Sequence, residues 1–287
     1  MKSNRLAILG LAALMAASCG SPSARIDATI AGASEENMYI KLLDINTFKD
    51  LDSLKTDKQG HFTYDVKMQK DQPEFVYIFR GDKKVTALIV EPGDKIRVRT
   101  HLDGGIVIEG SPESVKLQEV DEAYVSFVET MKDLYAVAAT AGNSTEGVAA
   151  RKKISDTYIK YYRDRVKFLL KNPYSLSTIP VLYQQVNSTV PVFSQYTDAL
   201  YFRNACDSLA TLYPKSKYVY ALGKEAQRRE DEFKMSIYLG SAKQSGFPEI
   251  TLPDVNGQKV ALADVDAKVI LVYFWSSTAT THKMFNI

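Results

Sequence analysis

The 287-residue sequence contains two thiols, Cys19 and Cys206. Cys19 ends an apolar N-terminal segment, whereas Cys206 lies between Ala205 and Asp207 in a helical pattern. If Cys19 is modified during export, one thiol remains, and a single thiol forms neither an internal disulfide nor a two-cysteine redox couple. No His or Lys lies beside Cys206 to stabilise a thiolate. We therefore expect Cys206 to be a small buried hydrophobic residue.

His282 follows a run rich in hydroxyl residues, in which Ser276, Ser277 and Thr281 are candidate nucleophiles with His282 as the base. That chemistry needs an oriented base and an oxyanion site. No acid nearby is placed to orient the imidazole, so His282 is interpreted as a polar residue on an exposed helical turn. The sequence predicts no catalytic residue here.

His61 and His101 are isolated in the sequence, and there are three His in all. Because no Cys, His and acid spacing matches a metal site, the sequence predicts no metal site. It also contains no glycine-rich phosphate loop, and we expect no cofactor.

Composition favours a globular protein, with 45% hydrophobic and 24% charged residues. The length suits one large or two to three small domains. Lys and Arg number 36 against 34 Asp and Glu. Nucleic-acid binding requires clustered basic excess, so no nucleic-acid partner is expected.

Residues 1–18 are interpreted as an export signal, with Lys2 and Arg5 before an apolar core from Leu6 to Met15. This core is too short to span a bilayer as a stable helix. Small residues then precede Cys19, and this arrangement resembles a bacterial lipobox. The resemblance implies lipidation of Cys19, with residues 19–25 as anchor and linker. The implied location is the cell envelope, on the periplasmic face of the outer membrane; an ordinary secretory signal is the alternative.

Residues 26–110 alternate apolar and polar side chains in short runs, clearest over 26–30, 62–66 and 96–99. Phe75 to Phe79 and Ala87 to Val90 are apolar throughout. Turn residues separate the runs. About seven or eight strands with this spacing predict an antiparallel β-sandwich or small barrel.

The period changes to a helical one at Ser111-Pro112-Glu113, which is typical of a helix start. We expect further helices over 145–170, 176–186, 195–212 and from Ser216 to Leu239, so that 111–240 is a helical region. Tyr residues recur at helical spacing. A carbohydrate or cofactor site is one interpretation, but packing is favoured.

Residues 241–246 are interpreted as a linker, after which Asn256-Gly257 is expected to connect two short strands. The apolar run from Val269 to Trp275 is typical of a central strand covered on both faces. Residues 247–287 resemble the opening of a TlpA-like, AhpC-TSA-type thioredoxin domain, related to the peroxiredoxins. The motifs are Phe247 to Gly257, Val260-Ala261-Leu262 and Lys268 to Trp275. Weaker motifs, such as 91–94 and 108–111, resemble a β-rich domain of unknown function that precedes such domains in exported lipoproteins.

The resemblance implies a Cys-x-x-Cys motif after the Phe-Trp pair, but Ala279 occupies the nucleophile's place and His282 that of the resolving cysteine. Neither residue can take part in dithiol exchange. A complete thioredoxin fold needs about a hundred more residues, so the resemblance implies an incomplete domain, either a truncation or a fragment.

Together these features predict an α+β fold with an N-terminal β-sandwich-like domain, a helical middle and an incomplete thioredoxin-like end. The favoured function is binding or scaffolding at a membrane, through a lipid on Cys19, with an unknown protein partner as a further expectation. Two alternatives remain open. One is a thiol-disulfide oxidoreductase, as the family would imply, and the other is a surface module that binds a ligand or glycan. Exposed aromatic residues on one sheet face would favour the latter.

Overall fold

The computed structural model describes residues 23–241, 250–267 and 269–271. The chain divides into two compact units, with the boundary between Ser236 and Ile237. The first unit holds the β-rich and helical regions, and the second holds a short hairpin. The expected signal peptide, over residues 1–18, lies outside the described residues.

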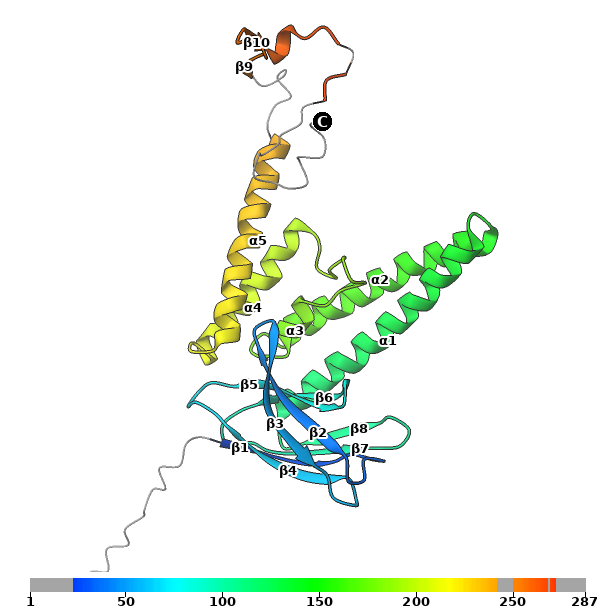
Figure 1. The fold of residues 1–287 in the computed structure, drawn as a ribbon, viewed down its shortest axis with the longest axis vertical. Helices are drawn as coiled ribbons and strands as arrows, with labels where there is room; N and C mark the ends of the chain where they lie inside the picture. Colours follow the sequence, from blue (N-terminus) through cyan, green and yellow to red (C-terminus); the bar gives the residue numbers. More distant parts are fainter. Residues whose placement is uncertain (1–22, 242–249, 268, 272–287) are drawn as a thin grey trace, which may run out of the picture. The chain divides into compact units, whose positions relative to one another are not determined.

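The first unit begins with strands that form two sheets (Figure 1). The sheet orders are β4-β1-β7-β8 and β3-β2-β5-β6. The predicted α+β class and β-sandwich-like domain are thereby confirmed. The strands are β1 (Ser23–Thr29), β2 (Asn37–Asp44), β3 (Thr47–Lys55), β4 (His61–Lys67), β5 (Glu74–Arg80), β6 (Lys83–Val90), β7 (Lys95–Thr100) and β8 (Ile106–Glu109).

The first sheet differs from the prediction in one pairing. β1 runs antiparallel to β4 but parallel to β7, with Ile26 opposite Ile96. Between β1 and β7 the chain crosses to the second sheet, so no tight turn forces β7 to run antiparallel to β1. Alternation still places Ile26, Ile96 and Val98 in the core between the sheets, where all three are fully buried.

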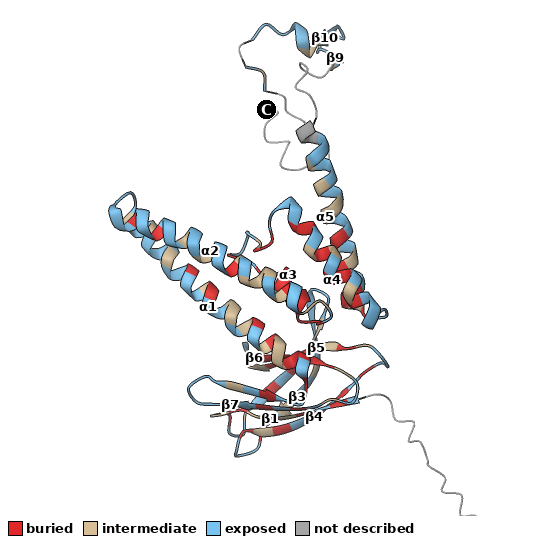
Figure 2. Ribbon diagram, turned by 180° about the vertical axis from the view of Figure 1, so that it is seen from behind, coloured by how far each residue is buried: buried red, intermediate tan, exposed pale blue. Residues whose placement is uncertain are grey.

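The apolar runs of β5 and β6 are explained by burial on both faces of their sheet. Val76 and Leu88 point into the sandwich core, whereas Phe75, Ala87 and Ile89 belong to a second core shared with the helices. Helix α1 (Pro112–Ala141) covers this outer face beside β6. Figure 2 shows the buried residues concentrated where helices and sheets meet.

The start of α1 is held on the sheet by two serines. Ser111 is the N-cap and accepts a hydrogen bond from the Ser114 backbone N–H at 3.3 Å. Both hydroxyls also donate to the carbonyl of Ile89, at 3.0 and 2.8 Å. Gly110 precedes them with φ +84°, and a Cβ there would overlap the carbonyl of Lys95. The predicted helix start at Ser111 is confirmed.

Helix α2 (Thr145–Lys171) returns antiparallel to α1 as a hairpin. The expected helix over 176–186 is shorter in the structure, α3 (Thr178–Leu182). After Leu182 the helix ends, and Gln185 bridges to Pro191. A 3₁₀ turn (Tyr196–Asp198) leads into α4 (Ala199–Leu212), and α5 (Lys217–Ser241) follows.

The second unit contains β9 (Thr251–Pro253) paired antiparallel with β10 (Lys259–Ala261), followed by a 3₁₀ turn (Leu262–Asp264). The turn holds Gly257 at φ +80°, and the Asp254 carboxylate accepts backbone hydrogen bonds from Asn256 and Gln258. This hairpin was predicted at Asn256-Gly257. Of the strand expected over 269–275, residues 269–271 are not in a strand, and 272–275 lie outside the described residues.

Candidate functional site

A groove of about 620 Å³ opens between the outer face of the second sheet and the helices α3 and α5. Its volume lies within the range of small-molecule sites. The lining is mainly apolar and aromatic. It consists of Leu43, Ile45, Asn46, Phe75, Tyr77, Ile179, Pro180, Tyr183, Tyr218, Ala221, Lys224, Glu225 and Arg228.

Strand alternation on β5 supplies the sheet side of the groove. Phe75, Tyr77 and Phe79 share one face because they are two residues apart. Phe48, on the edge strand β3, meets Tyr77 edge-on at 4.9 Å and Phe79 at 5.6 Å between ring centroids. Phe48 is 49% exposed. Burial raises the pKa of Tyr77 to about 12, so its hydroxyl stays neutral and can both donate and accept.

A polar network fixes the first turn of α5 on the sheet and thereby builds the opposite wall. The Tyr218 hydroxyl lies 2.6 Å from the Leu43 carbonyl and 2.7 Å from a Glu74 carboxylate oxygen. Burial first, and then this carboxylate, raise the pKa of Tyr218. Lys217 pairs with Glu74 at 3.0 Å and with Asp44 at 3.3 Å. The ring of Tyr218 therefore stays edge-on against Phe75, at 4.8 Å between centroids.

The mouth of the groove combines exposed apolar side chains with paired charges. Tyr183 is 47% exposed and Ile45 43%. Burial of its hydroxyl raises the pKa of Tyr183 to about 12. Glu225 bridges Arg228 at 2.6 Å and Arg229 at 2.7 Å, and the hydrogen bonds from Arg228 are the main cause of its lowered pKa. Exposed apolar side chains at a concave site are typical of binding surfaces.

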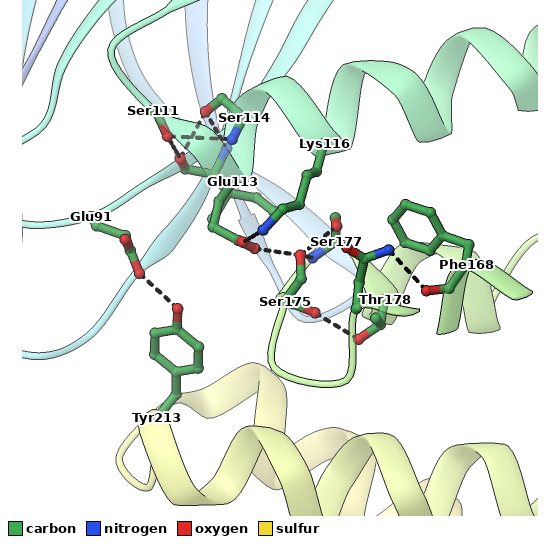
Figure 3. Close-up of polar contacts among 12 residues, drawn as sticks. Glu91, Ser111, Glu113, Ser114, Lys116, Phe168, Ser175, Ser177, Thr178 and Tyr213 are labelled. Atoms are coloured by element: carbon green, nitrogen blue, oxygen red, sulfur yellow. Dashed lines mark hydrogen bonds and ion pairs between the residues drawn. The ribbon is translucent and has the colours of Figure 1, made fainter. Parts of the chain in front are cut away.

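A buried polar cluster sets where the loop leading to α3 lies against α1 (Figure 3). Glu113 pairs with Lys116 at 2.8 Å and accepts a hydrogen bond from the Ser175 hydroxyl at 2.7 Å. Ser175 and Ser177 hydroxyls lie 2.6 Å apart. Since α3 begins at Thr178, this cluster positions the groove residues of α3. Glu113 belongs to the first turn of α1, as the helix-start pattern predicts, and its side chain is buried.

A second polar contact, also visible in Figure 3, ties the end of α4 to the sandwich. The Tyr213 hydroxyl donates to Glu91 at 2.9 Å. Burial raises the pKa of Glu91, and the hydrogen bond from Tyr213 acts in the opposite direction. The contact joins residues 122 positions apart, so it holds the helical region against the β-rich domain.

The lining of the groove is mostly apolar and aromatic. Its charged residues are Lys224, Glu225 and Arg228, and no His, Cys, Ser or Thr is among the lining residues. Within the described residues, no group of three or more His, Cys, Asp and Glu is arranged to hold a metal ion. Aromatic rings, the Asn46 amide and charges at the mouth are suited to holding an apolar body and orienting a polar end.

The site residues expected from the sequence, Cys19, Ala279 and His282, all lie outside the described residues. Cys206 is buried in α4, as predicted, and burial raises the pKa of its thiol. A Cβ at Gly223 would come 3.2 Å from its sulfur, so α4 and α5 approach closely there. A thiol in this position has little thiolate character.

His61, which is isolated in the sequence, lies close to two carboxylates in the fold. Its Nε2 lies 3.3 Å from Asp27 and its Nδ1 lies 3.7 Å from Asp57. The contact with Asp27 does not follow from sequence spacing, because Asp27 belongs to β1, which meets β4 through sheet pairing, with Thr29 opposite His61. His61 is far from the groove's lining residues in the fold, on the first sheet.

The sequence patterns do not predict the groove, although they contain two signals related to it. Phe75 to Phe79 is an apolar run, and exposed aromatic residues on one sheet face are expected of a ligand-binding module. On the outer face of β5, Phe75 is buried and Tyr77 is half-buried, whereas Phe48 on β3 is 49% exposed. What sequence patterns did not indicate is that residues 43–77 and 179–228 face each other.

The fold and the groove define an α+β protein in which a β-sandwich-like domain and a helical region together line a ligand-sized opening. Residues 24–117 match the family model described as domain of unknown function (DUF4369). The match ends at Leu117, a buried residue of α1, so it includes the helical turns that Ser111 and Ser114 hold on β6. No curated protein matches the chain. Five of the thirteen residues that line the groove lie inside the DUF4369 match, and eight lie outside it.

Proposed function

We propose that the protein is an envelope lipoprotein that binds an apolar, aromatic-containing ligand in the groove between its DUF4369 domain and its helices. The observation that carries the proposal is the groove itself, with Phe75, Tyr77, Tyr183 and Tyr218 in its lining. Lipidation of Cys19 anchors the protein at the periplasmic face of the outer membrane. The described residues include the groove that would bind the ligand. No helix among them is both long and apolar enough to cross a membrane.

Filling the groove is expected to abolish binding of an uncharged aromatic probe. Ala221 lines the groove on α5, and Ala221→Phe places a ring in the opening. With N-phenylnaphthylamine as the probe, fluorescence titration of the full chain is expected to show affinity reduced about tenfold or more, about 1.4 kcal/mol per decade. The reason is that the new ring occupies the volume that the probe needs.

The matched control is Ala210→Phe, which adds the same ring to an exposed position on α4. It is expected to bind the probe as the unmodified chain does. Equal probe affinity in the unmodified chain, Ala221→Phe and Ala210→Phe would contradict binding in the groove, because general surface hydrophobicity would then explain the signal.

The rival function, thiol-disulfide exchange, is tested by insulin reduction. We expect no turnover above buffer, because Ala279 and His282 stand where the resembling family has its cysteines. Cys206→Ala is expected to leave this baseline unchanged, since that thiol is buried. Turnover that survives Cys206→Ala would overturn the binding-protein proposal in favour of an enzyme.

A further inference from the structure

Helix α2 carries a large excess of positive charge that its own acids do not balance. It has eight Lys or Arg and three Asp or Glu. The basic residues are Arg151, Lys152, Lys153, Lys160, Arg163, Arg165, Lys167 and Lys171, and the acidic ones are Glu146, Asp156 and Asp164. Among the described residues, Lys167 is the α2 cation that forms an ion pair, with Asp164 at 3.4 Å.

Arg165 is the most unusual of these cations, because it is partly enclosed. Its guanidinium carbon lies 5.0 Å from the ring centroid of Tyr161 and 5.7 Å from that of Phe168. Its Nε is buried and has no hydrogen-bond partner within the described residues. A buried donor without a partner is costly, so its presence points to an acceptor that the chain does not supply.

The ring contacts leave the hydrogen-bonding capacity of Arg165 available. Guanidinium N–H groups lie in the plane of the group, whereas contacts with aromatic rings use its faces. Tyr161 is itself held in place, stacked on Phe127 at 3.9 Å and donating its hydroxyl to Gln184 at 2.8 Å. Arg165 therefore rests on a rigid aromatic support, and its Nε has no hydrogen-bond partner within the described residues.

Arg165 lines a second cavity, of about 420 Å³, between α1 and α2. Lys160 and Arg165 line it with hydroxyl residues of both helices, and neither cation has an ion-pair partner among the described residues. Asp164 is the carboxylate in the lining, and it pairs with Lys167. The lining residues are Ala123, Ser126, Phe127, Thr130, Thr157, Lys160, Tyr161, Asp164 and Arg165.

We propose that this cavity is an anion site that binds a phosphate group, with Arg165 as the main ligand and Lys160 as the second. The guanidinium group of arginine can donate hydrogen bonds to two phosphate oxygens at once, while the ammonium and hydroxyl groups can donate to the others. The cavity is larger than a phosphate ion, which leaves room for the group that carries it. A phosphorylated small molecule and a phospholipid headgroup share this chemistry. The site is distinct from the aromatic groove and does not depend on the proposed function.

The first arm of the test uses inorganic phosphate as the probe on the full chain. Phosphate is expected to raise the melting temperature in a saturable way, because it binds the folded state. Sodium chloride at equal ionic strength is not expected to do so. Arg165→Met is expected to weaken phosphate binding about tenfold or more, since charge-assisted hydrogen bonds are lost. Lys152→Gln removes an exposed charge from the same helix outside the lining and is expected to keep full affinity.

Two results would overturn the proposal: a phosphate effect matched by sodium chloride, or unchanged phosphate affinity in Arg165→Met. If Arg165→Met shows no cooperative melting, phosphate affinity is measured in Lys160→Gln instead. Lys160 is exposed, so its replacement leaves the packing intact. Unchanged phosphate affinity in Lys160→Gln would then overturn it. Weaker phosphate binding in Lys160→Gln would support it.

The second arm distinguishes the two sources of phosphate. It uses phosphatidylglycerol vesicles and the Cys19→Ser chain, so that acyl chains do not mediate the association. Sedimentation with the vesicles that is lost in Arg165→Met supports a lipid headgroup. Saturable phosphate binding without sedimentation supports a phosphorylated small molecule.

Discussion

Cys19→Ser is expected to move the protein from the membrane fraction to the soluble fraction. Acyl chains contribute about 0.8 kcal/mol per buried CH₂, so two or three chains on one residue hold a globular domain at a bilayer. Serine has no thiol to receive them. Fractionation of cells, followed by detergent extraction of the membrane pellet, measures the change.

Cys206→Ser is the matched control, because it removes the other thiol of the chain. Since Cys206 is buried in the helical region, the variant is expected to stay in the membrane fraction. If Cys19→Ser remains with the membranes and resists release, lipidation of Cys19 is not what anchors the protein.

Phe202→Ala is expected to lower the free energy of unfolding by about 3–5 kcal/mol. Phe202 is fully buried in α4. The Arg229 guanidinium carbon lies 4.0 Å from its ring centroid, and Tyr183 contacts it edge-on at 5.8 Å. The substitution leaves a cavity and removes the support of a groove residue, so weaker N-phenylnaphthylamine binding is also expected. Urea unfolding followed by circular dichroism gives the free energy.

Leu200→Ala on the same helix is the control for this cavity. Leu200 is 61% exposed, so its truncation is expected to change the free energy of unfolding by about 0.5 kcal/mol or less. A loss at Phe202 no larger than at Leu200 would mean that the α4 contacts with Tyr183 and Arg229 do not stabilise the folded state.

Several features of the fold could be predicted because they depend on residues close together in the chain. Ser111 and Pro112 mark a helix start through hydrogen bonds and dihedral angles within one turn. Alternation over 26–30 assigns one strand face to the core. The position of Cys206 in an apolar helical pattern predicts its burial. Such signals require no knowledge of what the segment packs against.

Other features depend on which distant segments meet. Three contacts join residues that are far apart in the sequence and that no local periodicity relates. They are the parallel pairing of β1 with β7, the contact of His61 with Asp27, and the hydrogen bond from Ser175 to the buried Glu113. The short α3 also reflects its surroundings, because the chain leaves the helix after Leu182 and Gln185 then bridges to Pro191.

The two cavities show most clearly which features follow from the sequence and which depend on packing. The sequence alone gives the aromatic residues of Phe75 to Phe79 and the basic residues of α2. Tertiary packing decides that Tyr77 and Tyr183 line one groove, and that Arg165 and hydroxyl residues of α1 line one cavity. The physical reason is that periodicity describes one segment's faces, whereas a binding site forms where faces of several segments leave space between them.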